Sequence, residues 1–298
     1  MTEPADYEDF RYASQDGLTL AGRKYGWDNP PDRLPVLCLA GLTRNSADFH
    51  ELALHLAGGK NGRRVLTLDY RGRGRSGYDR NWQNYNVITE AEDTIAGVVA
   101  AGLEEVAVVG TSRGGLIAMV LAAMRPAMLK AAVFNDIGPE IDGPGLVRIR
   151  QMLEETRGNL SSWQEAAGML ERIGKKHFPS FSAEDWMKQA RLIYTERDGK
   201  IVRDYDPNLA KTMMSIDLDV PIPTLWPQFH GLTGIPFMLI RGENTDLLSQ
   251  DCVSKMRQHH PAMTLVNVPD QGHAPDLGTS GLPARIARFV ESADLARH

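Results

Sequence analysis

Residues 107–115 read AVVGTSRGG, a stretch that joins a short apolar run to a glycine-rich turn around Ser112. The run VAVVG before the turn is typical of a strand buried on both faces, and LIAMVLAAM after it has apolar positions at helical spacing. A strand that passes through Gly-x-Ser-x-Gly straight into a helix projects the serine hydroxyl above the edge of the sheet. Gly110 and Gly114 fill the two glycine positions. We therefore predict that Ser112 is a nucleophile, whereas the alternative interpretation is a polar residue in an ordinary turn.

Short apolar runs recur along the chain, with helical patterns between them. They are PVLCLA at 35–40, RVLTLDY at 64–70, VAVVG at 106–110, AAVFND at 131–136, PFMLIRG at 236–242 and MTLVNVP at 263–269. Such runs are typical of strands buried on both faces. Strand and helix in repetition predict an α/β fold, in which a mostly parallel central sheet has helices on both faces. Ahead of the first run, Asp16-Gly17 within residues 8–27 is typical of a turn between two antiparallel strands.

The alternation stops between about residue 139 and residue 231, where no run is typical of a buried strand. Helical patterns occupy the segment instead, among them LVRIRQMLEETRG, SWQEAAGMLERIG and AEDWMKQARLIY. We therefore predict a core domain made of residues 1–138 and 232–298, with a helical cap inserted at 139–231. Most aromatic residues of the cap are expected in its own core, and one or two are expected to line an apolar pocket above Ser112. These aromatic residues are Trp163, Phe178, Phe181, Trp186, Tyr194, Trp226 and Phe229.

Composition and charge limit the partners of the chain. Hydrophobic residues make up 42% and charged residues 24% of the 298, as in ordinary globular proteins. The formal net charge of -5 argues against a nucleic-acid partner, because nucleic-acid-binding proteins usually carry a basic face. The longest apolar region, 106–124, is too interrupted to span a membrane, and the acidic start MTEPADYEDF lacks the pattern of a signal peptide. We expect a cytoplasmic monomer or homodimer that acts on a small-molecule substrate, with no membrane partner.

Two further features have simple structural interpretations. Cys38 and Cys252 show no CxxC or Cys/His spacing, so we predict neither a disulfide framework nor a metal site. The basic cluster RGRGRSG at 71–77 is interpreted as a structural loop, with a phosphate site as the alternative.

A serine hydroxyl becomes a good nucleophile only with a base within hydrogen-bond reach. His273 lies in DQGHA, directly after the last strand run, at the carboxyl end of a predicted parallel strand. Ligands and chemistry gather at that edge of open parallel sheets, so His273 is the predicted base. The other histidines are expected in packing or surface roles; they are His50, His55, His177, His230, His259, His260 and His298.

Five motifs occur in a characteristic order: LCLAGLTRNSADF, DYRGRGRSG, GTSRGG, IRGENTDLLS and DQGHAPDL. In this order they resemble the α/β-hydrolase family over nearly the whole chain. The resemblance implies that the backbone N–H groups of Leu42 and Arg113 form an oxyanion hole. Ala40 stands where the family usually has histidine, which removes that side-chain anchor of the loop but leaves its backbone donors. The resemblance also implies that the loop at 69–77 is braced by its own charged groups, and we expect a structural role for the Arg113 side chain.

His273 needs a carboxylate to fix its tautomer and to stabilise its cation. Asp246 lies just past the strand run PFMLI, at the position where the resemblance places the acid. Asp136, at the end of AAVFND, is the alternative, because some family members take the acid from the preceding strand; Glu243 ranks below both. We therefore predict a triad of Ser112, Asp246 and His273, with Asp136 as the alternative acid.

These residues predict a cofactor-independent serine hydrolase that cleaves carboxylic esters or lactones of small to medium apolar molecules through an acyl-enzyme on Ser112. Carbon–carbon bond hydrolysis, acyl transfer and perhydrolysis are alternatives, because the same triad can serve them. A ligand receptor with little turnover is the alternative from a different class.

Overall fold

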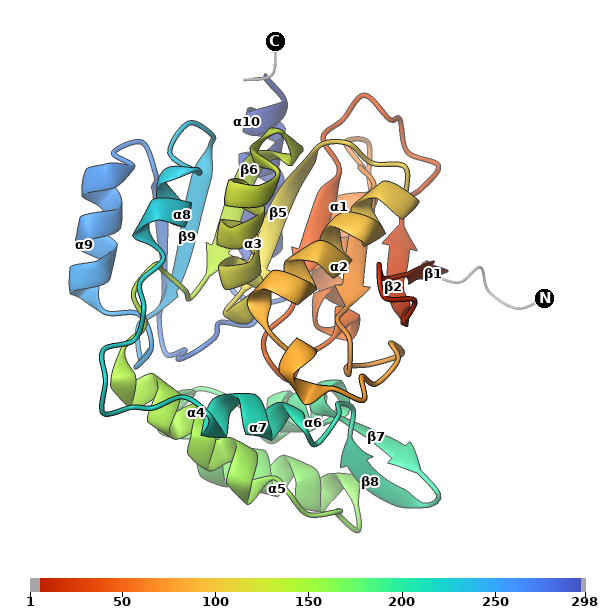
Figure 1. Ribbon diagram of the computed structural model, residues 1–298, viewed down its shortest axis with the longest axis vertical. Coiled ribbons are helices and arrows are strands. Elements are labelled where there is room, and N and C mark those ends of the chain that lie inside the picture. The colour runs from red at the N-terminus through yellow and green to blue at the C-terminus, as the bar shows by residue number, and fades with distance from the viewer. Residues whose placement is uncertain (1–5, 296–298) are drawn as a thin grey trace.

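An eight-stranded sheet forms the centre of the computed structural model, which describes residues 6–295 (Figure 1). Residues 1–5 and 296–298, and with them His298, lie outside the described part. The strands follow the order β1 (Glu8–Ala13), β2 (Thr19–Tyr25), β4 (Val65–Asp69), β3 (Val36–Leu39), β5 (Val106–Thr111), β6 (Leu129–Asn135), β9 (Phe237–Gly242) and β10 (Thr264–Val268). Strand β2 runs antiparallel to both of its neighbours, β1 and β4, and all other neighbouring pairs are parallel. The predicted mostly parallel sheet and the predicted N-terminal hairpin are confirmed.

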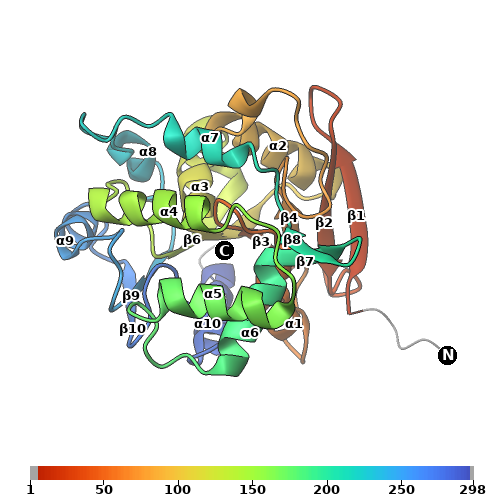
Figure 2. The ribbon, with the colours of Figure 1, turned by 90° about the horizontal axis from the view of Figure 1, so that it is seen from below.

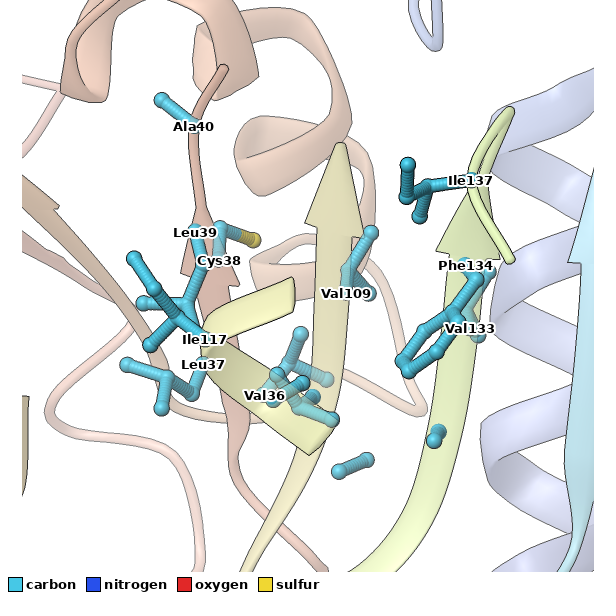
Figure 3. Close-up of a cluster of buried hydrophobic side chains, with 14 of the residues drawn as sticks. Val36, Leu37, Cys38, Leu39, Ala40, Val109, Ile117, Val133, Phe134 and Ile137 are labelled. Atoms are coloured by element: carbon cyan, nitrogen blue, oxygen red, sulfur yellow. The ribbon is translucent and has the colours of Figure 1, made fainter. Parts of the chain in front are cut away.

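The middle strands are buried on both faces, as their continuous apolar runs require. Every residue of β3 is inaccessible to solvent, and β5 is buried up to Gly110. Figure 3 shows the side chains of β3 near Ile117 of the helix that follows β5, with Val133 and Phe134 of β6 across β5 from them. In the register of the sheet, Leu39 lies beside Gly110, which brings the end of β3 next to the turn around Ser112.

Helices cover both faces of this sheet. On one face α1 (His50–Ala57) packs against α10 (Leu282–Leu295), and on the other α2 (Val87–Ala100) packs against α3 (Arg113–Met124) (Figure 2). Helix α9 (Gln250–His259) and three short 3-10 helices, Ser46–Phe49, Trp82–Asn84 and Pro126–Met128, complete the described core. The Asn86 side chain begins α2 by accepting hydrogen bonds from the backbone of Ile88 and Thr89, which leaves Glu90 in the first turn of that helix.

Most of the segment between β6 and β9, called the cap below, forms a layer below the sheet in Figure 1, whereas its last helix lies beside β9. It contains α4 (Gly143–Glu155), α5 (Trp163–Gly174), α6 (Ala183–Ile193), β7 (Tyr194–Arg197), β8 (Lys200–Arg203), α7 (Leu209–Met214) and α8 (Trp226–His230). A separate small core joins α5, α6 and the hairpin; it consists of Leu160, Ala166, Ala167, Leu170, Trp186, Ala190, Tyr194 and Ile201. Helix α8 differs from the other helices of the segment because it packs against α3, with Phe229 edge-on to Phe237 of β9.

The antiparallel hairpin β7–β8 is an element that the helical patterns of the segment did not predict. Its exposed and half-exposed positions carry Glu196, Arg197 and Lys200, so it has no continuous apolar run. The turn Asp198-Gly199 has positive φ at both residues, 51° and 70°, and an Asp-Gly turn of this kind is the signal that could have identified the hairpin.

The turn between β5 and α3 has the sharp geometry that the glycines predict. Ser112 has φ 51° and ψ -114°, a strained conformation for a residue with a side chain, and its backbone N–H donates to the Asn135 carbonyl at 3.0 Å. A Cβ on Gly114 would lie 2.0 Å from the Leu39 carbonyl oxygen, and a Cβ on Gly110 would lie 2.7 Å from the Gly114 backbone. The close packing of α3 on β3 therefore excludes a side chain at Gly114, and its close packing on β5 excludes one at Gly110.

Gly114→Ala should destabilise the protein by about 3 kcal/mol or more, because either the helix or β3 must move away from the added methyl group. Gly168→Ala in α5 is the matched control: that glycine is exposed, and a Cβ there meets nothing within 4 Å. The control should gain up to about 1 kcal/mol from helix propensity. Urea unfolding measures both changes, and equal stability of the two variants would contradict the packing described for the turn.

Candidate active site

Ser112, His273 and Asp136 form a continuous hydrogen-bonded line at the carboxyl edge of the sheet. His273 Nε2 lies 2.8 Å from Ser112 Oγ, and His273 Nδ1 lies 2.8 Å from Asp136 Oδ2. The Asp136 carboxylate is inaccessible to solvent and the His273 side chain is 7% exposed. A serine, a histidine and a carboxylate in this sequence are the arrangement in which a base can remove the serine proton.

Asp136 follows directly after β6 and is held by three hydrogen bonds. Its backbone has φ 58°, and its N–H donates to the Ile240 carbonyl of β9 at 2.8 Å. Oδ1 accepts from the Gly242 N–H at 2.8 Å, and Oδ2 accepts from the Thr245 hydroxyl at 2.5 Å as well as facing His273. A carboxylate has enough acceptor sites for all of these bonds, and together they fix its direction.

The predicted contact between Asp246 and His273 is wrong. Arg148 of α4 binds Asp246 in a bidentate ion pair, with Nε at 2.6 Å from Oδ2 and Nη2 at 2.9 Å from Oδ1. Burial opposes ionisation of Asp246, but the hydrogen bond and charge of Arg148 outweigh it and hold the pKa of this carboxyl below its ordinary value. Thr245, one residue earlier, occupies the side of the loop that faces Asp136, so Asp246 points toward the cap.

His177 strengthens this attachment of the cap to the core. Its Nε2 lies 3.9 Å from Asp246 Oδ2, its Nδ1 is 3.2 Å from the Asn244 carbonyl, and its own carbonyl accepts from the Asn244 amide at 3.3 Å. The loop at 242–246 therefore contributes Thr245 to the buried carboxylate and Asp246 to the cap.

The loop Ala40–Thr43 lies on the other side of Ser112. A Cβ built on Gly41 would be 3.9 Å from Ser112 Cβ, and the Leu42 backbone N–H makes no hydrogen bond to any other residue between 6 and 295. The N-terminus of α3 begins at Arg113, so its first N–H groups and its dipole are directed at the same region. The two predicted donors therefore come from elements that meet at Ser112.

The Arg113 side chain turns into the protein, as its expected structural role requires. Its Nε donates to Glu90 Oε2 at 2.5 Å, and its Nη2 donates to the Tyr85 carbonyl at 2.9 Å. This partner could not be identified from the sequence, because Glu90 is one of several carboxylates on a predicted helix.

A cavity of about 220 Å³ opens above Ser112 and His273, between the core and the cap. Its cap side is largely apolar and includes three of the aromatic residues named from the sequence, Phe178, Phe181 and Trp186. Gly41, Leu42 and Asn135 line it from the core. The prediction of an apolar pocket above Ser112 is thus supported, with aromatic side chains from α6 and the loop before it.

Four charged residues line this otherwise apolar cavity: the arginines Arg44 and Arg148 and the aspartates Asp48 and Asp276. Arg44 Nε lies 2.7 Å from Asp48 Oδ2, and its Nη2 donates to Gln189 Oε1 of α6 at 3.0 Å. Burial raises the pKa of Asp48 above its ordinary value, against the lowering effect of Arg44. The Nη1 groups of both arginines make no hydrogen bond to another described residue, which leaves donors for a bound molecule.

The loop at 69–77 has the structural role that was expected, although most carboxylates that bind its arginines lie outside the loop. Arg71 binds the carboxylates of Asp16, Asp79 and Asp93, and Arg75 binds Asp9. Asp69 accepts from the backbone N–H groups of Ser46 at 2.7 Å and Arg75 at 3.1 Å. Protein carboxylates therefore occupy the positions that the phosphate alternative would need.

Cys38 and Cys252 are free and buried. Between residues 6 and 295 no group of three or more His, Cys, Asp or Glu side chains is placed to hold a metal ion. None of the helices in the same range is long and apolar enough to cross a membrane.

Comparisons with known proteins agree with this fold. A family model described as alpha/beta hydrolase fold matches residues 35–275. The chain is 30% identical over 268 residues to the 3-hydroxybutyrate-oligomer hydrolase of Cupriavidus necator, covering 88% of each protein. It is 27% identical to the 2-(acetamidomethylene)succinate hydrolase of Mesorhizobium japonicum, over 80% of this chain and 81% of the relative.

Among solved structures, an alpha/beta hydrolase from Novosphingobium aromaticivorans superposes with a TM-score of 0.89 at 38% sequence identity. That superposition covers 97% of this chain and 99% of the other. The sheet order, the turn around Ser112 and these similarities together show that the chain belongs to the α/β-hydrolase family.

Proposed function

We propose that this protein hydrolyses carboxylic esters or lactones through an acyl-enzyme formed on Ser112. The observation that carries the proposal is the hydrogen-bonded line from Ser112 through His273 to Asp136, which opens into a cavity between core and cap. His273 acts as base and acid, and Asp136 takes the role of the triad carboxylate.

In the first half of the reaction, Ser112 Oγ attacks the acyl carbon while His273 Nε2 accepts the serine proton. The carbonyl oxygen becomes an oxyanion, and the N–H groups of Leu42 and Arg113 donate hydrogen bonds to it. The buried carboxylate of Asp136 stabilises the imidazolium. His273 then returns the proton to the alcohol oxygen, the C–O bond breaks, and the acyl group remains on Ser112.

The second half uses water as the nucleophile. His273 accepts a proton from water, which attacks the acyl carbon, and the same two N–H groups bind the new oxyanion. The proton passes back to Ser112 Oγ as the acid is released.

The cavity favours a short acyl chain, and its two arginines could donate hydrogen bonds to a negative group on that chain. Its volume of about 220 Å³ is below the range of pockets that hold drug-sized ligands, and its walls are mostly apolar. Arg44 and Arg148 offer unpaired donors there. Both relatives act on compounds named as carboxylic acids, 3-hydroxybutyrate oligomers and an acetamidomethylene succinate. Esters with a free carboxylate are therefore the substrates to test beside neutral esters.

Ser112→Ala should lower kcat/KM for p-nitrophenyl butyrate by at least about 1000-fold, because no acyl-enzyme can form. The measurement is release of p-nitrophenol by purified wild type and variant, with circular dichroism to verify folding. A folded variant with wild-type turnover would contradict the mechanism.

The two aspartates should differ sharply. Asp136→Asn should lower kcat by about 1000-fold or more, because an amide neither stabilises the imidazolium nor selects the productive tautomer. Asp246→Asn, which breaks the ion pair with Arg148, should change kcat by less than about 10-fold. Steady-state kinetics on the same ester measures both changes. A larger loss of kcat in Asp246→Asn than in Asp136→Asn would identify Asp246 as the triad acid.

Arg148→Met tests recognition of a negative group. A charge-assisted hydrogen bond contributes enough that KM for mono-p-nitrophenyl succinate should rise about 10-fold or more in the variant. p-Nitrophenyl butyrate, with the same chain length and no carboxylate, should change less than about 3-fold and reports any general disturbance of the cap. Equal changes for the two esters would show that Arg148 only attaches the cap.

A further inference from the structure

Glu90 is a buried carboxylate that binds two arginines at once. It lies in the first turn of α2 and is inaccessible to solvent. Oε1 accepts from Arg73 Nη1 at 2.7 Å, and Oε2 accepts from Arg113 Nε at 2.5 Å. Arg73 is also fully buried, and Arg113 is 12% exposed. Glu90 is therefore shared between two cations that it separates from each other.

Each arginine is connected to one of the two backbone N–H groups that we assign to binding of the oxyanion. Arg113 provides its own backbone N–H at the start of α3. Arg73 Nε donates to the Leu42 carbonyl at 2.8 Å, so Arg73 is hydrogen-bonded to the loop that carries the Leu42 N–H. A single carboxylate thus connects the two elements that must meet at the serine.

The backbone around the Leu42 N–H is fixed by hydrogen bonds to three successive carbonyl groups. The carbonyl of Gly41 accepts from the Arg44 N–H at 3.2 Å. The preceding carbonyl, that of Ala40, accepts from the Tyr70 hydroxyl at 3.2 Å, and Arg73 binds the following one. These bonds hold the loop although Ala40 offers no side-chain anchor, and of the groups that make them only Arg73 is bound to Glu90.

The negative charge of Glu90 is needed for this arrangement because it is the carboxylate that both Arg73 and Arg113 bind. Without its charge, Arg73 and Arg113 would be two buried cations with no carboxylate between them. Arg73 Nη2 is buried and already has no hydrogen-bond partner among the described residues, so loss of the bond to Glu90 would leave a second nitrogen of this guanidinium without a charged partner. We expect the two guanidinium groups to separate, and the Leu42 loop and the start of α3 to move with them.

We propose that Glu90 is a positioning residue of the oxyanion hole: by binding Arg73 and Arg113 together it fixes the distance between the Leu42 and Arg113 N–H groups. This inference rests on the proposed function, because it concerns how the oxyanion of that reaction is bound. Preorganised donors act on the transition state and contribute little to ground-state binding. A positioning role therefore affects kcat, whereas a purely structural role affects stability alone.

Glu90→Gln tests the proposal, since glutamine keeps the size of the side chain and removes its charge. For p-nitrophenyl butyrate, kcat should fall about 10- to 100-fold while KM stays within about 3-fold, the pattern of lost transition-state binding. The inhibition constant of an alkyl trifluoromethyl ketone, whose serine adduct carries an oxyanion, should rise by the same factor as kcat/KM falls. Unchanged kcat and inhibitor affinity in the folded variant would overturn the proposal.

Asp294→Asn is the matched control, because it breaks another ion pair of a buried arginine. Arg63 is 3% exposed and its Nη2 lies 3.1 Å from Asp294 Oδ2, at the end of α10. This control should lower Tm without changing kcat or inhibitor affinity. A loss of kcat in the control equal to that in Glu90→Gln would assign both effects to reduced stability and overturn the proposal.

If Glu90→Gln does not fold, Arg113→Met makes the same test from the other side of the ion pair. It leaves Glu90 bound to Arg73, and it should still lower kcat and inhibitor affinity in parallel. Wild-type values in this variant would overturn the proposal. Failure of the proposed function has a different signature, because the wild type itself would then neither hydrolyse the ester nor bind the ketone.

Discussion

The close passage of α3 over the end of β3 is the constraint on which the rest of the site depends. Because a Cβ at Gly114 would lie 2.0 Å from the Leu39 carbonyl, the chain can enter α3 only through a tight turn, and Ser112 takes its strained conformation there. The same contact brings the loop after β3 against the serine. Ser112 and the predicted oxyanion donors are thus placed together by backbone packing, and hydrogen bonds from polar side chains around them fix that placement.

The loop at 242–246 has two roles: it binds the carboxylate of Asp136, and through Asp246 it attaches the cap. Asp136 is enclosed by Gly242, Thr245 and His273, whereas Asp246 extends to Arg148 and joins the loop to the cap. Arg148 also lines the cavity, so the contact that attaches the cap lies beside the space for substrate. Attachment of the cap and recognition of an acidic group would then use the same side chain.

The central strands could be predicted from the sequence because strands buried on both faces need continuous apolar runs, as in β3 and β5. The hairpin β7–β8 could not be found this way, because its side chains are half exposed and only Asp198-Gly199 marks its turn. Choosing between Asp136 and Asp246 depended on side-chain direction. Both follow parallel strands, and the deciding partner, Arg148, comes from the inserted cap. Glu90 could not be identified for a similar reason, since its partners are Arg73 in a distant loop and Arg113 at the start of α3.

The most direct test of the account is labelling with a fluorophosphonate, followed by mass spectrometry of the peptides. An activated serine forms a covalent bond to phosphorus, so the account predicts modification of Ser112 in wild type and greatly slowed modification in Asp136→Asn. The Asp246→Asn variant should label at nearly the wild-type rate. Folded wild-type protein that remains unmodified at Ser112, or that is modified at another serine, would contradict the assignment of Ser112 as nucleophile.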